Sequence, residues 1–307
     1  MILPIAGYLC SRSGSFGGWK PTYFISAGFT GFVLVLWFFL AADKPSKHPF
    51  ISHRETTYIL QKTSDESLGK RKERKSIPWK SMVTSLPLIV GILALICHEY
   101  PLVIMLALLP AYIKEVLHLE NTTTGFVSAL PVLSLWVMKT LSSSLASYLN
   151  SRKGGPFLFR RTALVKIFNA IASSGLAVSL AVVPLLQEPN ELPSAIVAMC
   201  MANAFAGLHS PGVQTALLQI APAFTGVITG ISFALVAASS ILNKLSYGYI
   251  LDLKGGSKWA LLFEISAVVA ALPVIFFSIW GSADLQPWST PEKKESKPTD
   301  DERLPPS

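Results

Sequence analysis

The sequence predicts an all-α protein, a polytopic bundle of membrane-spanning helices. Of its 307 residues, 51% are hydrophobic and only 14% are charged, and the mean hydropathy is +0.48. Soluble domains average roughly 25% charged residues. Apolar stretches recur at the length of about 20 residues that crosses a hydrocarbon core of about 30 Å. Since no strand pattern is present and backbone groups in lipid must be satisfied internally, each stretch is predicted to be a helix.

Seven of the apolar stretches are long enough to cross a bilayer. They cover approximately residues 21–42, 86–113, 126–149, 164–186, 194–218, 224–251 and 259–280. A further stretch, residues 1–10, is too short to cross, and we interpret it as the second half of a helix whose beginning is missing. It has neither a basic leading region nor a clear small-residue cleavage site, so we predict no removable signal.

The basic residues gather in the polar segments between the apolar stretches, where they predict the orientation of the chain in the membrane. Residues 43–80 form the longest such segment, are rich in Lys and Arg, and are predicted to lie in the cytoplasm. Their run KRKERK at 70–75 is interpreted as a topology determinant rather than a nuclear signal or a lipid-binding patch. The formal net charge of +8 therefore indicates a lipid bilayer as partner, and no nucleic acid.

The most unusual stretch is the second long span, because it carries His98 and Glu99 near its middle. A charge at membrane depth costs about 3 kcal/mol on insertion scales, so such residues usually face a water-filled cavity or a partner. Pro101 removes a backbone donor and disfavours helical geometry at the preceding residue, and we expect the helix to bend or open there. The alternative is an interior His that is bonded to a neighbouring helix.

A second breakable region lies in the span 194–218, which contains Asn203, His209, Pro211 and Gly212. Two interrupted helices in one bundle are typical of a binding site. Lys139, about halfway along the span 126–149, has two interpretations. It snorkels toward the interface, or it neutralises an acid on a neighbouring helix.

Enzyme and metal chemistry find little support in the residues. His98 and Glu99 begin an H-E-x-x-H motif, but position 102 is Leu, so the second zinc ligand is missing. No G-x-S-x-G elbow or phosphate-binding loop occurs. The cysteines Cys10, Cys97 and Cys200 are too few and too far apart to predict a disulfide framework or a metal site. We therefore predict no enzymatic activity and no cofactor.

Ordered motifs along most of the chain carry a family resemblance. The most specific is the loop D-x-P-x-x-H-x-x-I-S-x-x-E-x-x-Y-I at residues 43–59. The others are IPW at 77–79 with SLP at 85–87, LPAYIKE at 109–115, GFVSALP at 125–131, KIFN at 166–169, and IAP at 220–222 running to the glycines at 226 and 230. Together they resemble the sialin, vesicular glutamate transporter and sodium-phosphate cotransporter group, the solute carrier family 17 branch of the major facilitator superfamily.

The resemblance implies a division of the chain. Transporters of this group have twelve spans in two six-helix halves, which maps residues 1–42 to the end of helix five and helix six. Residues 43–80 become the cytoplasmic loop, and residues 81–282 the C-terminal half with helices seven to twelve. The Pro-rich, charged residues 283–307 are predicted to be a disordered cytoplasmic tail. A cavity between two halves would lack one wall, so the chain is not expected to transport alone.

The chain departs from the family pattern at positions where chemistry is expected. His98 stands where the group carries an Arg or another polar residue for an anionic substrate, and Glu99 stands at a position that is usually small or an amide. Lys139 replaces a small or hydroxyl residue. Because Glu99 and Lys139 both depart and both lie near mid-depth, we predict that they form an intramembrane ion pair, which reduces the cost of burying either charge alone.

The resemblance implies a secondary transporter, in which two halves rock around a central site and move an anionic solute, organic or phosphate, together with a proton or sodium. In this interpretation His98 contacts the substrate and suits proton coupling, while Glu99 tunes the properties of His98. Asn203, His209 and Gln214 supply polar contacts. The alternative is a non-transporting membrane protein that associates with a full-length relative. The sequence does not decide whether the chain resides in the plasma, lysosomal or vesicle membrane.

Overall fold

The structure is a computed structural model that describes residues 2–12, 18–48, 50–65, 77–151, 161–186, 191–252 and 258–289. Within these ranges every regular element is a helix, which confirms the predicted all-α class. Seven helical segments are long and apolar enough to cross a membrane, as predicted. They are Lys20–Leu40, Leu86–Glu115, Asn121–Asn150, Arg161–Leu185, Leu192–Gln219, Pro222–Asp252 and Lys258–Trp280.

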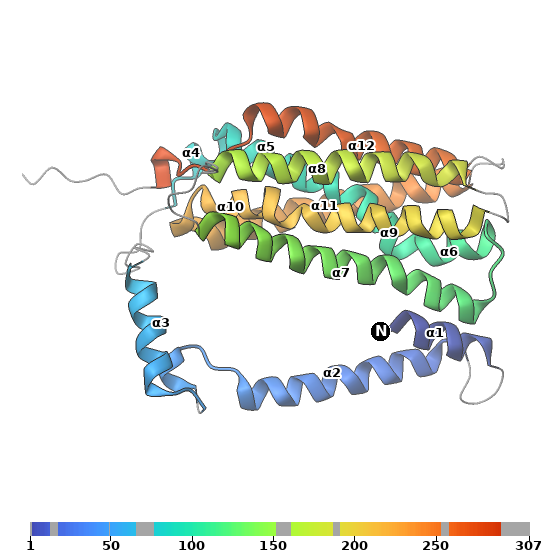
Figure 1. The fold of residues 1–307 in the computed structure, drawn as a ribbon, viewed down its shortest axis with the longest axis horizontal. Helices are drawn as coiled ribbons and strands as arrows, with labels where there is room; N and C mark the ends of the chain where they lie inside the picture. The colour runs from blue at the N-terminus through green and yellow to red at the C-terminus, as the bar shows by residue number, and fades with distance from the viewer. Residues whose placement is uncertain are drawn as a thin grey trace, which may run out of the picture.

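The spanning helices correspond to labelled elements in Figure 1. They are α2 (Lys20–Leu40), α5 (Leu86–Val103) with η2 (Ile104–Leu108) and α6 (Leu109–Glu115), α7 (Asn121–Ser151), α8 (Arg161–Val182), α9 (Leu192–Leu208) with η5 (Ser210–Gln214) and α10 (Thr215–Gln219), α11 (Thr225–Asp252), and α12 (Lys258–Trp280). The shorter helices are α1 (Ile2–Ser11), α3 (His53–Asp65) and α4 (Trp79–Val83), with the single turns η1 (Pro45–Lys47), η3 (Val183–Leu185), η6 (Pro222–Phe224) and η7 (Pro287–Ser289).

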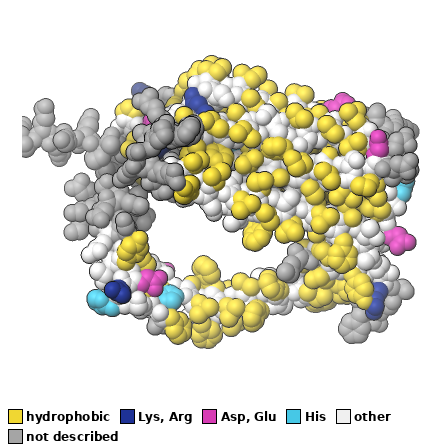
Figure 2. All heavy atoms as spheres, in the orientation of Figure 1, with side chains coloured by type: hydrophobic (Ala, Val, Ile, Leu, Met, Phe, Trp, Pro, Cys, Tyr) yellow, Lys and Arg dark blue, Asp and Glu magenta, His cyan; other side chains and the backbone are white. Residues whose placement is uncertain are grey.

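The helices from α5 to α12 form one elongated bundle (Figure 1). In it α7 and α8 pack on α9, and α12 packs on α5 and α8. Hydrophobic side chains dominate the lateral face seen in Figure 2, as expected of a surface that meets lipid. The core includes Tyr112, whose ring meets the edges of Trp259 and Phe263 at centroid distances of 5.4 and 5.0 Å. These contacts tie α6 to α12.

Two glycines allow close helix contacts. A Cβ on Gly207 of α9 would lie 2.8 Å from both the Leu135 carbonyl oxygen and the Lys139 nitrogen of α7. A Cβ on Gly7 of α1 would lie 2.6 Å from the Asn121 carbonyl oxygen at the start of α7. Absence of a side chain lets helix backbones approach in lipid. Gly207 thus brings α9 against the part of α7 that carries Lys139.

The N-terminal helices lie beside the bundle rather than within it. α1 packs on α7 and α2 packs on α1, while no residue of α2 is buried. Figure 1 shows α2 running along the side of the bundle toward α3. In α3, the Ser52 hydroxyl accepts a hydrogen bond from the Glu55 N–H at 3.2 Å. The segment predicted as a loop therefore contains a capped helix, and its run KRKERK lies outside the described residues.

The predicted disorder of residues 283–307 is wrong for the first part of that tail. The Gln286 N–H donates to the Ile220 carbonyl at 2.9 Å, and the Ala283 N–H donates to the Thr162 hydroxyl at 3.0 Å. Trp288 packs near Phe224, with a centroid distance of 6.2 Å. Composition predicted disorder, but an apolar side chain and two backbone hydrogen bonds attach this segment to the end of the bundle. Residues 290–307 lie outside the described residues.

The contact at Gly207 generates a stability prediction. We expect Gly207→Ala to lower the melting temperature of the purified chain, because the added Cβ meets backbone atoms that cannot move independently, an overpacking cost of about 1–3 kcal/mol. Gly230→Ala is the matched control, since a Cβ on that glycine of α11 meets nothing within 4 Å. Equal melting temperatures for the two variants would contradict the close α7–α9 contact.

Candidate functional site

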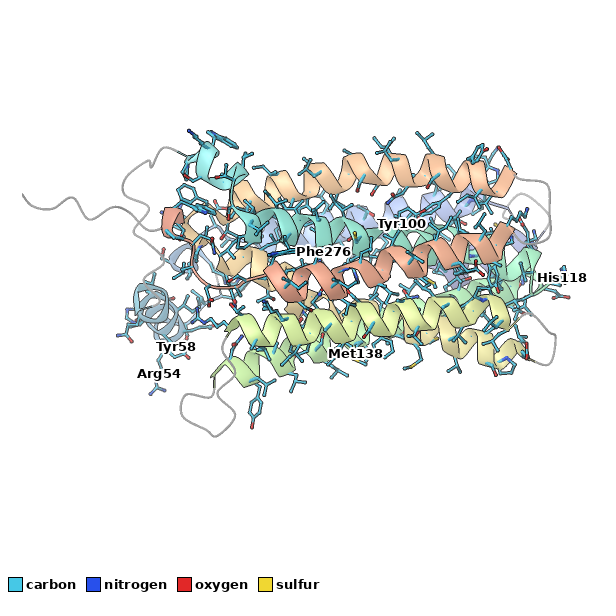
Figure 3. The ribbon with its side chains drawn as sticks, turned by 90° about the horizontal axis from the view of Figure 1, so that it is seen from above. Arg54, Tyr58, Tyr100, His118, Met138 and Phe276 are labelled. Carbon is cyan, nitrogen blue, oxygen red and sulfur yellow. The ribbon has the colours of Figure 1, made fainter. Side chains whose placement is uncertain are left out.

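The first interrupted helix is α5, but the interruption does not lie at Pro101. Helix α5 continues through Pro101 to Val103 and is followed by a π-helical turn at Ile104–Leu108. The Ile104 N–H bonds to the Pro101 carbonyl, so the Tyr100 carbonyl is left to the Tyr247 hydroxyl of α11, which donates to it. In Figure 3 Tyr100 lies inside the bundle. The carbonyl that Pro101 leaves without its helical donor is that of Cys97, four residues earlier. The Tyr247 bond instead satisfies a carbonyl released where the helix changes at Ile104, and it joins α5 to α11.

The second interrupted helix is α9, which breaks where the sequence predicts. It ends at Leu208 and passes through a π-helical turn at Ser210–Gln214 into α10. Pro211 has no N–H, so it cannot bond to the carbonyl four residues before it. That carbonyl, on Gly207, accepts a hydrogen bond from the Ser142 hydroxyl of α7 at 3.4 Å. Single π-helical turns of this kind are frequent at functional sites.

The two interrupted helices place His98 and His209 face to face, and we call these two residues the histidine pair. Their ring centroids are 3.7 Å apart and their planes differ by 4°. The side chains are only 5% and 1% exposed. His98 hydrogen-bonds to the backbone of Ala206. Its Nδ1, and both ring nitrogens of His209, have no hydrogen-bond partner within the described part of the chain.

A small polar cavity of about 60 Å³ lies beside the histidine pair. Its remaining lining combines charged, polar and apolar side chains, namely Glu99, Lys139, Ser210, Gln214, Leu102, Leu135 and Ala206. The Ser210 hydroxyl donates to the Gln214 side-chain oxygen at 3.2 Å. The volume exceeds the roughly 10–15 Å³ that one water requires. The cavity thus offers cationic, anionic and neutral polar groups to a small hydrophilic occupant within an otherwise apolar bundle.

Glu99 and Lys139 line this same cavity, as the predicted ion pair requires. The two charges act on each other electrostatically. Among the described residues, however, they make no nitrogen–oxygen contact of 4 Å or less; such a contact joins Lys258 and Glu115 at 3.6 Å. Glu99 is half-buried and Lys139 is exposed. A direct Glu99–Lys139 ion pair therefore stays a prediction.

The structure brings together four of the five predicted substrate contacts. His98, Glu99, His209 and Gln214 line the cavity, but Asn203 does not. Asn203 is fully buried, and its amide donates to the Met199 carbonyl of its own helix at 3.1 Å. Sequence reasoning gave no role to Ser210, although its place between His209 and Pro211 was a signal. Leu135 and Ala206 carried no such signal, because their positions depend on helix packing.

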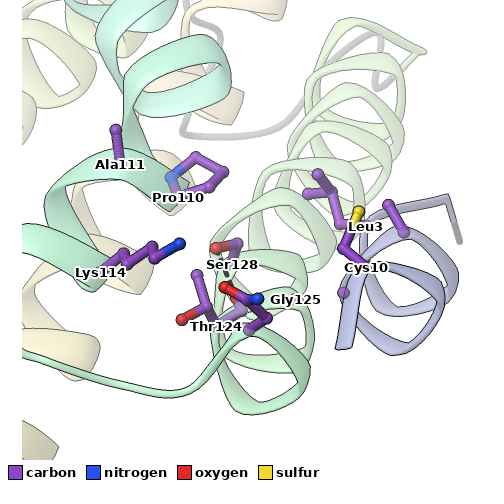
Figure 4. Close-up of a pocket in the computed structure, with 11 residues that line it drawn as sticks. Leu3, Cys10, Pro110, Ala111, Lys114, Thr124, Gly125 and Ser128 are labelled. Atoms are coloured by element: carbon purple, nitrogen blue, oxygen red, sulfur yellow. Dashed lines mark hydrogen bonds between the residues drawn. The ribbon is translucent and has the colours of Figure 1, made fainter. Parts of the chain in front are cut away.

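A larger pocket, of about 290 Å³, lies between α1, α6 and α7. Figure 4 shows its lining, which includes Leu3, Pro110 and Gly125, with Lys114 as the charged member. The Ser128 hydroxyl there already donates to the Thr124 carbonyl at 2.6 Å. Such an apolar hollow offers few free polar groups to a hydrophilic solute. We therefore place the candidate site at the smaller polar cavity.

Comparison with known proteins identifies related sequences over almost the whole chain. The sequence profile of the Major Facilitator Superfamily matches residues 1–242. Vesicular glutamate transporter 2.2 of Danio rerio is 28% identical over 295 residues, which cover 95% of this chain and 48% of that protein. Vesicular glutamate transporter 2 of Homo sapiens is 27% identical over 295 residues. Human Sialin is 27% identical over 287 residues, which cover 94% of this chain and 55% of Sialin. The chain spans about half the length of the curated relatives it matches.

The shared cavity generates a test of the predicted ion pair. We expect Glu99→Gln and Lys139→Gln each to lower the melting temperature, because each leaves one charge at membrane depth without its opposite. Compared with the single exchanges Glu99→Lys and Lys139→Glu, the double variant that carries both should recover most of the loss, with a coupling energy of about 0.5–3 kcal/mol. Lys258→Gln, which removes an exposed ion pair, is the control and should change little. Strictly additive effects of the two exchanges would argue against a pair.

Proposed function

Because the chain belongs to the Major Facilitator Superfamily, we propose that it serves in secondary active transport of a small anionic solute by alternating access, with the cavity beside the histidine pair as the solute site. Members of this superfamily are transporters, not enzymes. The relatives among the vesicular glutamate transporters and Sialin support an anion as the solute. Symport with a proton is proposed over symport with sodium, because the site presents two imidazoles.

The observation that carries this proposal is the position of cationic and hydrogen-bonding groups inside an apolar bundle. His98 comes from α5, Lys139 from α7, and His209 with Gln214 from the interrupted α9 segment. Charge-assisted hydrogen bonds are the strong way to hold a carboxylate or phosphate. In the proposed mechanism Glu99 balances Lys139 while the site is empty, and the solute anion takes over that role when it binds. Transporter sites are typically built where interrupted helices meet near the membrane centre.

The proposed orientation places α3 and the C-terminal segment on the cytoplasmic side. Figure 3 shows Arg54 and Tyr58 of α3 at one end of the molecule and His118 at the opposite end. Just before the turn η7, the Gln286 N–H donates to the Ile220 carbonyl at the α10–α11 junction, near the same end as α4 (Figure 1). The basic composition of residues 43–80 supports the cytoplasm for this end. We also propose that α5 to α12 correspond to the C-terminal six-helix half of the fold.

A second candidate function, association with a full-length relative, is favoured by the exposure of Lys139. This side chain is exposed, yet it lies about 18 Å from the end of α7 at 1.5 Å per residue. Charged side chains at such depth almost always face a bundle interior or a water-filled cavity. We propose that further membrane helices cover this face of α7 and that they belong to a partner protein. Transport would then belong to the assembly.

Uptake of labelled glutamate into proteoliposomes tests the transport proposal. Glutamate is the first solute to test, because the names of the similar vesicular glutamate transporters include it. We expect His98→Ala to reduce uptake by about tenfold or more, the effect of losing a hydrogen bond to a charged group worth about 1.5–3 kcal/mol. The control is His118→Ala, which removes an exposed imidazole outside the spans. Equal losses in the two variants would count against a role of His98 at the site.

Blue-native electrophoresis of the chain, expressed alone and beside a full-length vesicular glutamate transporter 2, tests the association. We expect the chain to shift to a complex only when the relative is present, because the relative covers Lys139. An unrelated polytopic membrane protein at the same expression level is the control. A stable monomer that moves labelled anion by itself would disprove the association and support the first candidate.

A further inference from the structure

The histidine pair has a geometry that limits how much positive charge it holds. The two rings are parallel and 3.7 Å apart, and both side chains are buried. Two imidazolium ions stacked at this distance would repel strongly, since like charges at short range are costly where water is excluded. One imidazolium against one neutral imidazole has no such repulsion. The stacked arrangement is therefore compatible with one proton and not with two.

The pair also presents free proton acceptors. The Ala206 hydrogen bond occupies one ring nitrogen of His98, and Nδ1 is the nitrogen without a partner. Neutral imidazole has one N–H and one nitrogen with a free lone pair, so Nδ1 of His98 is the acceptor when the other nitrogen donates to the Ala206 carbonyl. Both nitrogens of His209 are unpartnered as well. Buried polar groups are normally hydrogen-bonded, and an unsatisfied one calls for an explanation such as a bound water or ion, strain or a chemical role.

The charges around the pair are few. From α7, Lys139 acts electrostatically on both rings. From α5, Glu99 lines the cavity beside them. The η5 turn contributes only the neutral Ser210 and Gln214. Among the described residues, α8, α11 and α12 contribute no side chain to this cavity. Glu99 is half-buried, so this carboxylate is partly exposed while it lines the cavity.

We propose that His98 and His209 form a single proton-binding unit, in which the stacked rings together take up one proton per chain. A hydronium ion delivers the proton: its O–H bond breaks, an N–H bond forms at a ring lone pair, and a neutral water molecule leaves. Its use as the coupling proton rests on the proposed transport function, but its binding does not. The assignment explains why a second imidazole, on a different helix, lies against the one at the expected solute contact. His209 disperses the charge that His98 acquires.

The test is a proton-uptake titration of the purified full chain in lipid nanodiscs, with no solute present, read out by ¹⁵N signals of labelled histidine rings. We expect His209→Phe, which keeps an aromatic ring in the stack, to leave total uptake unchanged, because His98 still takes the one proton. The double variant His98→Phe with His209→Phe should lose one proton relative to the wild-type chain. His118→Gln is the matched control, because it removes an exposed imidazole away from the pair, and it should leave the ¹⁵N signals of His98 and His209 unchanged.

Each result of this titration decides the proposal. Loss of one proton in His209→Phe while His98 still titrates would mean two independent sites and would overturn it. Equal uptake by the double variant and the wild-type chain would mean that the pair takes up no proton, which also overturns it. If His209→Phe does not elute as a folded monodisperse protein, His209→Gln replaces it with the same expectation. A one-proton pair in a chain that moves no glutamate would leave this inference intact and count against the transport function.

Discussion

The bundle depends on one constraint, which is that polar groups within the hydrocarbon must find their partners inside the protein. Three backbone carbonyls illustrate how the chain meets it. The Gly207 carbonyl is taken by Ser142, the Tyr100 carbonyl by Tyr247, and the Pro273 carbonyl of α12 by Asn169 of α8, at 3.0 Å. In each case a polar side chain on one helix satisfies the backbone of another. These hydrogen bonds therefore join the spans together, and the bond from Ser142 also satisfies the carbonyl that Pro211 leaves free.

The histidine pair contains three of the buried polar atoms for which this constraint is not met. Three ring nitrogens remain without partners in the described part of the chain, beside a cavity that holds both signs of charge. Elsewhere in the bundle, the buried Ser232 and Ser266 hydroxyls donate to their own helix, whereas single atoms such as the Tyr112 hydroxyl also lack a partner. An unpartnered polar group in a low-dielectric interior is costly. Three such atoms lie together at the junction of two interrupted helices, beside the cavity, and this grouping suits the junction to binding.

Much of the architecture was predictable because length and hydropathy alone determine whether a segment crosses a bilayer. The predicted span 86–113 differs from the observed Leu86–Glu115 only at one end, and 259–280 from Lys258–Trp280 by one residue. The break in α9 was also predictable, since Pro211 and Gly212 weaken a helix locally. The break in α5 was misplaced: the π-helical turn begins at Ile104, after Pro101, where the Tyr100 carbonyl bonds to Tyr247 of another helix. The packed tail to Ser289 was missed for the same reason.

The sequence by itself determined that the chain forms membrane helices, where the spans lie, and that His98, Glu99, Lys139 and His209 lie within them. These properties follow from the local composition of each segment and the thickness of a bilayer. Only the tertiary structure decided that the two imidazoles stack, that Asn203 turns back to its own helix, and that Lys139 reaches the same cavity as Glu99. Such contacts depend on how helices that are far apart in the chain rotate and approach one another. The fit of side chains between helices, at positions such as Gly207, sets this arrangement, and the hydropathy pattern of a single segment does not reveal it.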